Sequence, residues 1–287
     1  MTMHDPAWLD AQYNNRARVP DHPEILRRWV SESVEAMRGG GRELDVRYGG
    51  GPNEHLDIFR AQGGHGSEHA PVLFFIHGGY WRSFDKREHA FVAPPFTREG
   101  ACVVVPNYAL CPAVTVPDIV MQMVRALAWT WRHIGKHGGD PGRITVVGHS
   151  AGGQLAAMMM ACVWQAYDPS LPQDLVKGTL SISGLHDLEP IMHSPYLQTS
   201  LNLTPEQVRM ASPARLPAPG RGKLYALCGG DESEEYHRQN RSIRDAWGAA
   251  RVPVCEELPG CNHFNVLNAL TQPRSRLKRL ALELVLG

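Results

Sequence analysis

The fold is decided at residues 144–153, which read ITVVGHSAGG and are followed by an apolar run of helical length. A β-rich run, a glycine-containing turn and a helix form the setting of a GxSxG nucleophile elbow. Gly148 and Gly152 carry no side chains that would collide in so sharp a turn. The pattern predicts that Ser150 is a nucleophile at the start of a helix, where the backbone N–H of Ala151 faces the group under attack.

Strand-like runs alternate with helical ones on both sides of this turn, which indicates a parallel sheet covered by helices. The turn-rich stretch GGGPNE at residues 49–54 separates the first two runs and predicts an antiparallel hairpin at one edge. We therefore predict an α/β chain with a mostly parallel eight-stranded sheet and helices on both faces. The predicted strands are 43–48, 55–60, 72–76, 101–105, 143–147, 178–183, 223–228 and 254–258.

Two segments stand outside this alternation. Residues 1–41 predict an N-terminal helical extension, and residues 185–220, rich in Pro, Ser and Met, predict a cap or lid. The simplest organisation is one domain over residues 1–287 that includes both, with a surface loop at residues 63–70. Candidate contacts of the extension with the body are Trp8, Tyr13, Ile25, Leu26, Trp29, Val34 and Met37.

The composition bears on partners and compartment. Lys plus Arg and Asp plus Glu number 29 each, without a basic stripe, so nucleic acid is not an expected partner. The longest apolar run, residues 155–164, is about half of what a membrane span requires, so no membrane association is expected. The first residues lack a signal-peptide pattern, and six cysteines form no CxxC pair. We expect a cytoplasmic protein that acts on a small molecule, with a homodimer as one possible oligomer.

A second glycine motif, HGGYW, occupies residues 77–81 directly after a predicted strand. In this topology the loop supplies the second donor of an oxyanion hole. We assign the backbone N–H groups of Gly78 and Gly79, together with that of Ala151, to this role. Removing one such donor typically costs on the order of 10²–10³ in turnover.

The other side chains of the two glycine motifs are expected to support the site rather than to take part in the reaction. His149 is expected to pack beside the elbow, and His77 to fix its loop through the ring nitrogens rather than to transfer protons. Tyr80 and Trp81 are either ordinary packing residues or lining residues of a pocket, and the sequence leaves both open.

A carboxylate and a histidine follow the last two predicted strands, in the order nucleophile, acid, base that this topology uses. Residues 224–233 read LYALCGGDES, and residues 260–264 read GCNHF. We assign His263 as the base that takes the proton of Ser150 and returns it to the leaving group, and Asp231 as the acid that orients it. The competing carboxylates are Asp187, Glu232 and Glu234.

Together these motifs resemble the arylformamidase, or kynurenine formamidase, branch of the α/β-hydrolase superfamily, whose mark is HGGxW. The resemblance continues through GHSAGG and SGLHDLEP, residues 231–240 and the NHF at 262–264, and covers most of the chain after Val72. It implies an α/β-hydrolase fold and the hydrolysis of N-formyl-L-kynurenine to L-kynurenine and formate, without a metal or other cofactor. The residues implied are the triad Ser150, Asp231 and His263 with the oxyanion donors named above.

A formamide needs little room for its acyl group but a roomy aromatic site for its leaving group. The candidates for that site are Tyr80, Trp81, Tyr108 and Tyr196. A carboxylesterase for small or aryl esters would use the same triad, because fold and triad do not fix the substrate. A catalytically silent relative that binds a ligand is a third interpretation, and the intact set of Ser, Asp and His argues against it.

Overall fold

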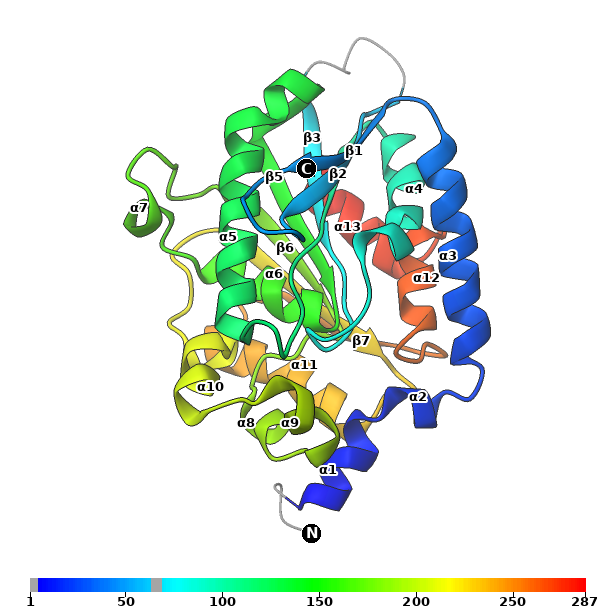
Figure 1. Ribbon diagram of the computed structural model, residues 1–287, viewed down its shortest axis with the longest axis vertical. Coiled ribbons are helices and arrows are strands. Elements are labelled where there is room, and N and C mark those ends of the chain that lie inside the picture. Colours follow the sequence, from blue (N-terminus) through cyan, green and yellow to red (C-terminus); the bar gives the residue numbers. More distant parts are fainter. Residues whose placement is uncertain (1–4, 63–68) are drawn as a thin grey trace.

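The computed structural model of the 287-residue chain describes residues 5–62 and 69–287, so most of the loop predicted at residues 63–70 lies outside the described residues. The described residues form an eight-stranded sheet in the order β1-β2-β4-β3-β5-β6-β7-β8 (Figure 1). All eight predicted strands are present, and β5 extends beyond its prediction at both ends. The strands are β1 (Arg42–Arg47), β2 (His55–Phe59), β3 (Ala70–Ile76), β4 (Cys102–Pro106), β5 (Gly139–His149), β6 (Val176–Ile182), β7 (Lys223–Gly229) and β8 (Val254–Leu258).

The pairing of the strands confirms a mixed, mostly parallel sheet. β1 pairs with β2 in antiparallel register, as the turn at residues 49–54 predicts, and β2 is also antiparallel to β4. The remaining pairs, from β4 through β3, β5, β6 and β7 to β8, are parallel. Parallel strands need crossovers, which accounts for the helical lengths between them.

The central strands are apolar on both faces because helices cover both sides of the sheet. All seven residues of β3 are buried. Phe74 and Ile76 belong to one core cluster. Leu73 and Phe75, which alternate with them along the strand, belong to the other, as the two-residue period of a strand requires. The two cores therefore lie on opposite faces of one sheet.

Helices α5 and α6 cover one face, and α3, α4, α12 and α13 cover the other (Figure 1). No helix of the described residues combines the length and apolar character needed to cross a bilayer. The helices beyond the extension and the cap are η1 (Lys86–Glu88), η2 (Ala90–Val92), α4 (Ala93–Thr97), α5 (Val116–His133), η3 (Ile134–His137), α6 (Ala151–Ala161), α7 (Trp164–Tyr167), α11 (Glu234–Trp247), α12 (Asn265–Thr271) and α13 (Arg276–Leu286).

The N-terminal residues are helical, as predicted, in α1 (Pro6–Tyr13), α2 (Asn15–Arg18) and α3 (His22–Arg38). Among the predicted contact residues, Tyr13 and Trp29 are fully buried. The others are at least half-buried, and Trp8, Ile25, Leu26 and Met37 pack against the cores. Helix α1 lies against α9 and α11, at the edge where the central strands end (Figure 1).

The segment predicted as a cap, residues 185–220, contains α8 (Glu189–Met192), α9 (Pro195–Leu201), α10 (Pro205–Ala211) and η4 (Pro213–Arg215). Helix α10 begins where the sequence predicts, with Thr204 and Gln207 forming a reciprocal capping box. The cap lies on the same side of the molecule as α1 (Figure 1). Both stand over the carboxyl ends of the parallel strands, where open α/β sheets bind their ligands.

Candidate active site

Ser150 sits on a strained turn between β5 and α6, as the elbow motif predicts. Its backbone has φ +57° and ψ −120°, a conformation that residues with side chains rarely adopt. A Cβ atom added to Gly148 would lie 2.0 Å from the carbonyl oxygen of Gly152, and one added to Gly152 would lie 2.1 Å from the oxygen of Ile76. Both glycines are therefore required for the turn that presents the Ser150 hydroxyl.

His263 connects Ser150 to a carboxylate. Its Nε2 lies 3.1 Å from Ser150 Oγ, and its Nδ1 lies 2.7 Å from Glu232 Oε2. Both partners of the imidazole are buried, and the Glu232 side chain has no exposed surface. A serine, a histidine and a carboxylate thus form one hydrogen-bonded chain, the geometry that general-base activation of a serine requires.

The assignment of Asp231 as the acid is wrong, because the carboxylate at His263 belongs to the next residue. Asp231 is exposed, and its backbone N–H donates to Cys261 O at 3.0 Å, which fixes the turn after β7. That turn directs the side chain of Glu232 inward toward His263. Glu232 stood among the competing carboxylates in the sequence, but spacing along the chain does not say which of two adjacent acids faces the base.

Glu232 is held by two further donors. Its Oε1 accepts from the Gly229 N–H at 2.6 Å and from the Ser183 hydroxyl at 2.5 Å. Ser183 follows β6 and has a positive φ of 52°, a strained conformation of the kind that collects at functional sites. Sequence reasoning assigned no role to Ser183, although it ends a predicted strand and begins the SGLHDLEP stretch of the family resemblance.

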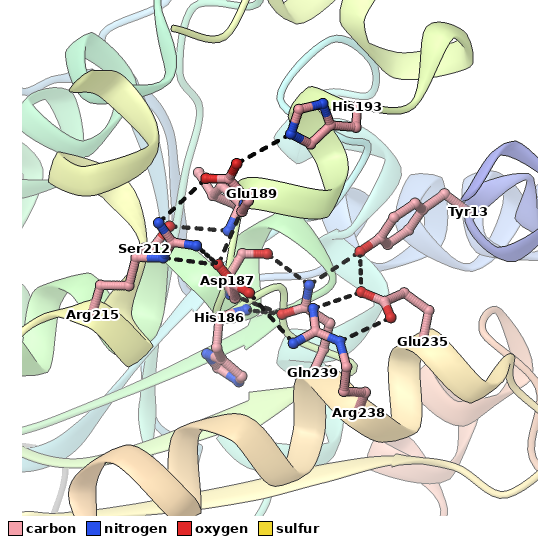
Figure 2. A network of polar contacts seen from close by, with 11 residues as sticks. Tyr13, His186, Asp187, Glu189, His193, Ser212, Arg215, Glu235, Arg238 and Gln239 are labelled. Carbon is pink, nitrogen blue, oxygen red and sulfur yellow. Dashed lines mark hydrogen bonds and ion pairs between the residues drawn. The ribbon is translucent and has the colours of Figure 1, made fainter. Parts of the chain in front are cut away.

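Asp187, the other competing acid, belongs to a separate polar network (Figure 2). Its carboxylate lies 2.9 Å from Arg215 and 3.4 Å from Arg238, and its backbone groups bond the side chain of Gln239. Gln239 also donates to the Tyr13 hydroxyl at 3.1 Å. The network joins the cap, α11 and α1, so Asp187 serves to dock these elements on one another.

His149 packs beside the elbow, as predicted. Its Nε2 lies 2.9 Å from the carbonyl oxygen of His263, and the two rings are 4.9 Å apart. Burial, with a smaller effect of His263, lowers the pKa of His149 well below its usual value. His149 is therefore neutral at physiological pH and positions the segment that carries His263.

The HGGYW loop lies against Ser150. A Cβ atom on Gly78 would lie 3.0 Å from Ser150 Cβ, so this backbone comes as close to Ser150 as the predicted role of an oxyanion donor requires. Gly79 has φ +106°, and its carbonyl oxygen accepts from the N–H groups of Arg82 and Ser83 at 3.0 Å. These bonds fix the peptide planes of the loop.

His77 fixes this loop, as predicted. Its Nδ1 lies 2.8 Å from Gly78 O, its Nε2 lies 3.3 Å from Asn107 Oδ1, and burial lowers its pKa. Tyr108 stacks on the His77 ring at 4.2 Å, and its hydroxyl donates to the carbonyl oxygens of His77 and Gly78. The assignment of Tyr108 to the substrate pocket is therefore wrong. Its hydroxyl and its ring both contact the loop, and it does not line the cavity beside Ser150.

Ser150 and His263 line a cavity of about 340 Å³. Of the predicted pocket residues, Tyr80 and Tyr196 line it, whereas Trp81 does not. Trp81 is fully buried with φ +54°, and its Nε1 donates to Gln154 in α6 at 3.1 Å, so the turn directs it into the core. The other lining residues are Asn15, Arg16, Trp29, Gly79, Arg82, Ser83, Phe84, His149 and Phe264.

The N-terminal extension contributes three of these lining residues, Asn15, Arg16 and Trp29, none of which the sequence marks as functional. No local motif connects them to Ser150, since more than a hundred residues of chain separate them from the elbow. Among the residues that the structure describes, no group of three or more His, Cys, Asp or Glu side chains could hold a metal ion.

The chain is similar to known hydrolases over most of its length. A family model described as alpha/beta hydrolase fold matches residues 73–263. Kynurenine formamidase of Danio rerio is 29% identical and aligns with 96% of this chain and 95% of its own length. Esterase LipQ of Mycobacterium tuberculosis is 31% identical and aligns with 89% of this chain and 68% of its own length.

A solved structure is also similar over nearly the whole chain. The crystal structure of a Silicibacter protein, provisionally assigned as a thioesterase, has a TM-score of 0.82 and 26% identity and covers 97% of this chain and 99% of its own. The chain is a hydrolase that belongs to the α/β-hydrolase fold family, and it is similar to kynurenine formamidases over nearly its whole length.

Proposed function

We propose that this protein is a metal-independent serine hydrolase that cleaves an aryl formamide, N-formyl-L-kynurenine, to L-kynurenine and formate. The observation that carries the proposal is the hydrogen-bonded chain Ser150–His263–Glu232, which opens on a cavity lined by aromatic and cationic side chains. The similarity to kynurenine formamidases supports the choice of substrate.

In the first half of the reaction, Ser150 Oγ attacks the formyl carbon while His263 Nε2 takes its proton. Glu232 keeps the proton of the imidazole on Nδ1 and stabilises the imidazolium that forms. The carbonyl oxygen becomes an oxyanion, for which Gly78, Gly79 and Ala151 are the proposed donors. His263 then protonates the aryl nitrogen, the C–N bond breaks, and the amine leaves a formyl ester on Ser150.

In the second half, His263 takes a proton from water, and the resulting hydroxide attacks the formyl ester. The tetrahedral intermediate collapses with the electron pair of the broken bond on Ser150 Oγ, which recovers its proton from His263. Formate leaves and the resting hydroxyl is restored. Both halves use the same three side chains, so no further group is needed for the proton balance.

The cavity offers recognition for an aromatic leaving group that carries a carboxylate. Arg16 lies on its wall, and among the described residues its guanidinium makes no hydrogen bond or ion pair. Arg82 stacks over the Tyr196 ring at 4.6 Å and donates to the carbonyl oxygen of that residue at 2.8 Å, so its charge is held in place. Guanidinium groups bind carboxylates with matched geometry, and the rings of Tyr80 and Phe84 provide apolar surface.

The proposal is tested by the specificity constants, kcat/KM, for N-formyl-L-kynurenine and for a short aryl ester, with Ser150→Ala as the blank. We expect a strong preference for the formamide and no turnover by Ser150→Ala. Turnover of the ester with negligible formamide cleavage would make the protein a carboxylesterase, the second candidate, which the similarity to esterase LipQ supports. Retained activity in a folded Ser150→Ala variant would overturn the nucleophile.

A further inference from the structure

Tyr196, in the cap helix α9, forms part of the wall of the cavity that Ser150 also lines. The helix is held on the molecule by Leu197 and Leu201, which are buried in the core cluster of that face. Tyr196 itself stands in the first turn, where the backbone N–H groups of a helix have no partner within it. The place of this residue therefore depends on contacts with other elements.

The backbone of Tyr196 is held at both of its polar groups by side chains from outside the cap. Its N–H donates to Asp10 Oδ1 in α1 at 3.0 Å, and its carbonyl oxygen accepts from Arg82 Nη1 at 2.8 Å. These two partners lie 186 and 114 positions away along the chain. The N-terminal extension and the loop after the HGGYW motif thus fix one residue of the cap between them.

Asp10 is a firm support for this contact. Its Oδ1 also accepts from the hydroxyl of Ser194, a fully buried residue, at 2.6 Å. Hydrogen bonds to a carboxylate are about twice as strong as those between neutral groups. The helix that carries Asp10 is itself anchored by Leu9 and Tyr13, which have no exposed surface. The first turn of α9 is therefore tied to a part of the molecule that does not move freely.

Arg82 supplies the second support, on the side of the loop. Its guanidinium stacks over the Tyr196 ring at 4.6 Å, and its Nη1 donates to Ser200 Oγ at 3.1 Å. The loop has bonds of its own, because the Gly79 carbonyl oxygen accepts from the N–H and the hydroxyl of Ser83 at 3.0 Å and 2.9 Å. Loosening the first turn of α9 would therefore displace Tyr196 and leave the loop beside Ser150 in place.

We propose that Asp10 is a positioning residue for substrate specificity, which holds Tyr196 in the cavity wall against the aromatic ring of the substrate. Asp10 does not line the cavity and acts only through its contact with α9. The inference rests on the proposed function in its nucleophile and in the aromatic character of the substrate, but not on the choice between a formamide and an ester.

The test is Asp10→Leu, which removes the acceptor and places a better helix former of similar length in α1. Steady-state constants are measured for phenyl acetate and ethyl acetate, which share the acyl group and differ in the aromatic ring. We expect KM for phenyl acetate to rise about five- to tenfold with kcat nearly unchanged, because an aromatic contact made in both the ground state and the transition state is lost. The value of kcat/KM for ethyl acetate should not change, since this substrate has no ring to place against Tyr196.

Two matched variants show whether the contact itself is responsible. Of the two carboxylate oxygens of Asp10, only Oδ1 accepts hydrogen bonds from the described residues, and the amide of Asp10→Asn keeps such an oxygen. This variant should therefore behave like the parent. So should Asp21→Leu, which replaces an exposed acid of the same extension whose side chain makes no capping bond. If Asp10→Leu does not fold, Asp10→Ala takes its place in the same comparison.

An equal loss of kcat/KM for both esters would mean that Asp10 supports the fold or the loop in general, and it would overturn the inference. An unchanged KM for phenyl acetate would do the same. A defect in Asp10→Asn or in Asp21→Leu as large as that in Asp10→Leu would also overturn it, because the effect would then come from charge or from the extension as a whole.

These measurements also keep the two proposals apart. Hydrolysis of phenyl acetate without cleavage of N-formyl-L-kynurenine would refute the proposed substrate, while the effect of Asp10→Leu on the two esters would still decide the inference. Cleavage of N-formyl-L-kynurenine with a KM that Asp10→Leu leaves unchanged would refute the inference alone.

Discussion

Replacing Glu232 by Gln is expected to remove nearly all activity while leaving the fold in place. The Oε1 atom of Glu232 accepts from the Gly229 N–H, which cannot turn away, and from the Ser183 hydroxyl. The amide oxygen of the new side chain must therefore occupy this position, and its NH₂ group must face His263 Nδ1. An amide N–H can only donate, so Nδ1 becomes an acceptor and the ring proton moves to Nε2. In that tautomer His263 cannot accept the proton of Ser150.

The magnitude follows from this change of tautomer. Enforcing the wrong tautomer in a serine triad lowers kcat by about 10⁴, and we expect a loss of about 10³ to 10⁴ here. That loss corresponds to about 4 to 5.4 kcal/mol of transition-state stabilisation, at 1.36 kcal/mol for each factor of ten. KM should change little, because Glu232 does not line the cavity.

The assay is the turnover of a short aryl ester and of N-formyl-L-kynurenine by Glu232→Gln and by Asp231→Asn, with thermal unfolding of both variants. Asp231 is exposed, and its substitution should change kcat by no more than about twofold, as is typical at a surface position. A loss in Asp231→Asn as large as that in Glu232→Gln would refute the assignment of the acid. So would a Glu232→Gln enzyme with kcat within tenfold of the parent.

Three further predictions concern the loop, the cavity wall and the core. Gly79→Ala should abolish turnover and lower Tm, because φ is +106° and the new Cβ would lie 2.1 Å from Ser83 O; an active variant with the parent Tm would contradict this. Arg16→Gln should raise KM for N-formyl-L-kynurenine about tenfold or more but not KM for a neutral aryl ester, and equal effects on both substrates would exclude a carboxylate contact. Burial lowers the pKa of His186 to about 3, so the unfolded chain binds a proton below about pH 6.5 that the folded chain takes up only near pH 3. The contribution of this residue to the free energy of unfolding is therefore fully present above pH 6.5 and is lost as the pH falls toward 3. In urea unfolding, the free energy of unfolding of His186→Gln should fall less between pH 7 and pH 4 than that of the parent. An equal fall in both proteins would refute His186 as the cause.

The strands and the elbow could be predicted because their causes are local. A β-rich run must pair, and a turn as sharp as that at Ser150 needs glycine on both sides, so residues 144–153 carry the information for both in one stretch. The histidine after the last strand is similarly fixed, since parallel strands bring their carboxyl ends to one edge of the sheet. These features locate Ser150 and His263 without any knowledge of packing.

The tertiary structure alone decided which side chains face His263 and the cavity. Asp231 and Glu232 are neighbours of the same charge, and only the hydrogen bonds of the turn after β7 direct the second one toward His263. Trp81 has a positive φ, which sends a residue that looks like pocket lining into the core instead.

The walls of the cavity depend on contacts between segments far apart in the chain. Asn15 bonds Tyr80, 65 residues away, and Tyr236, 221 residues away, and no motif records such pairs. The sequence by itself therefore determined the sheet and the placement of Ser150 and His263 at one site, because short stretches specify them. The carboxylate that faces His263 and the lining of the cavity were decided only by folding, because each depends on the direction in which a packed side chain points.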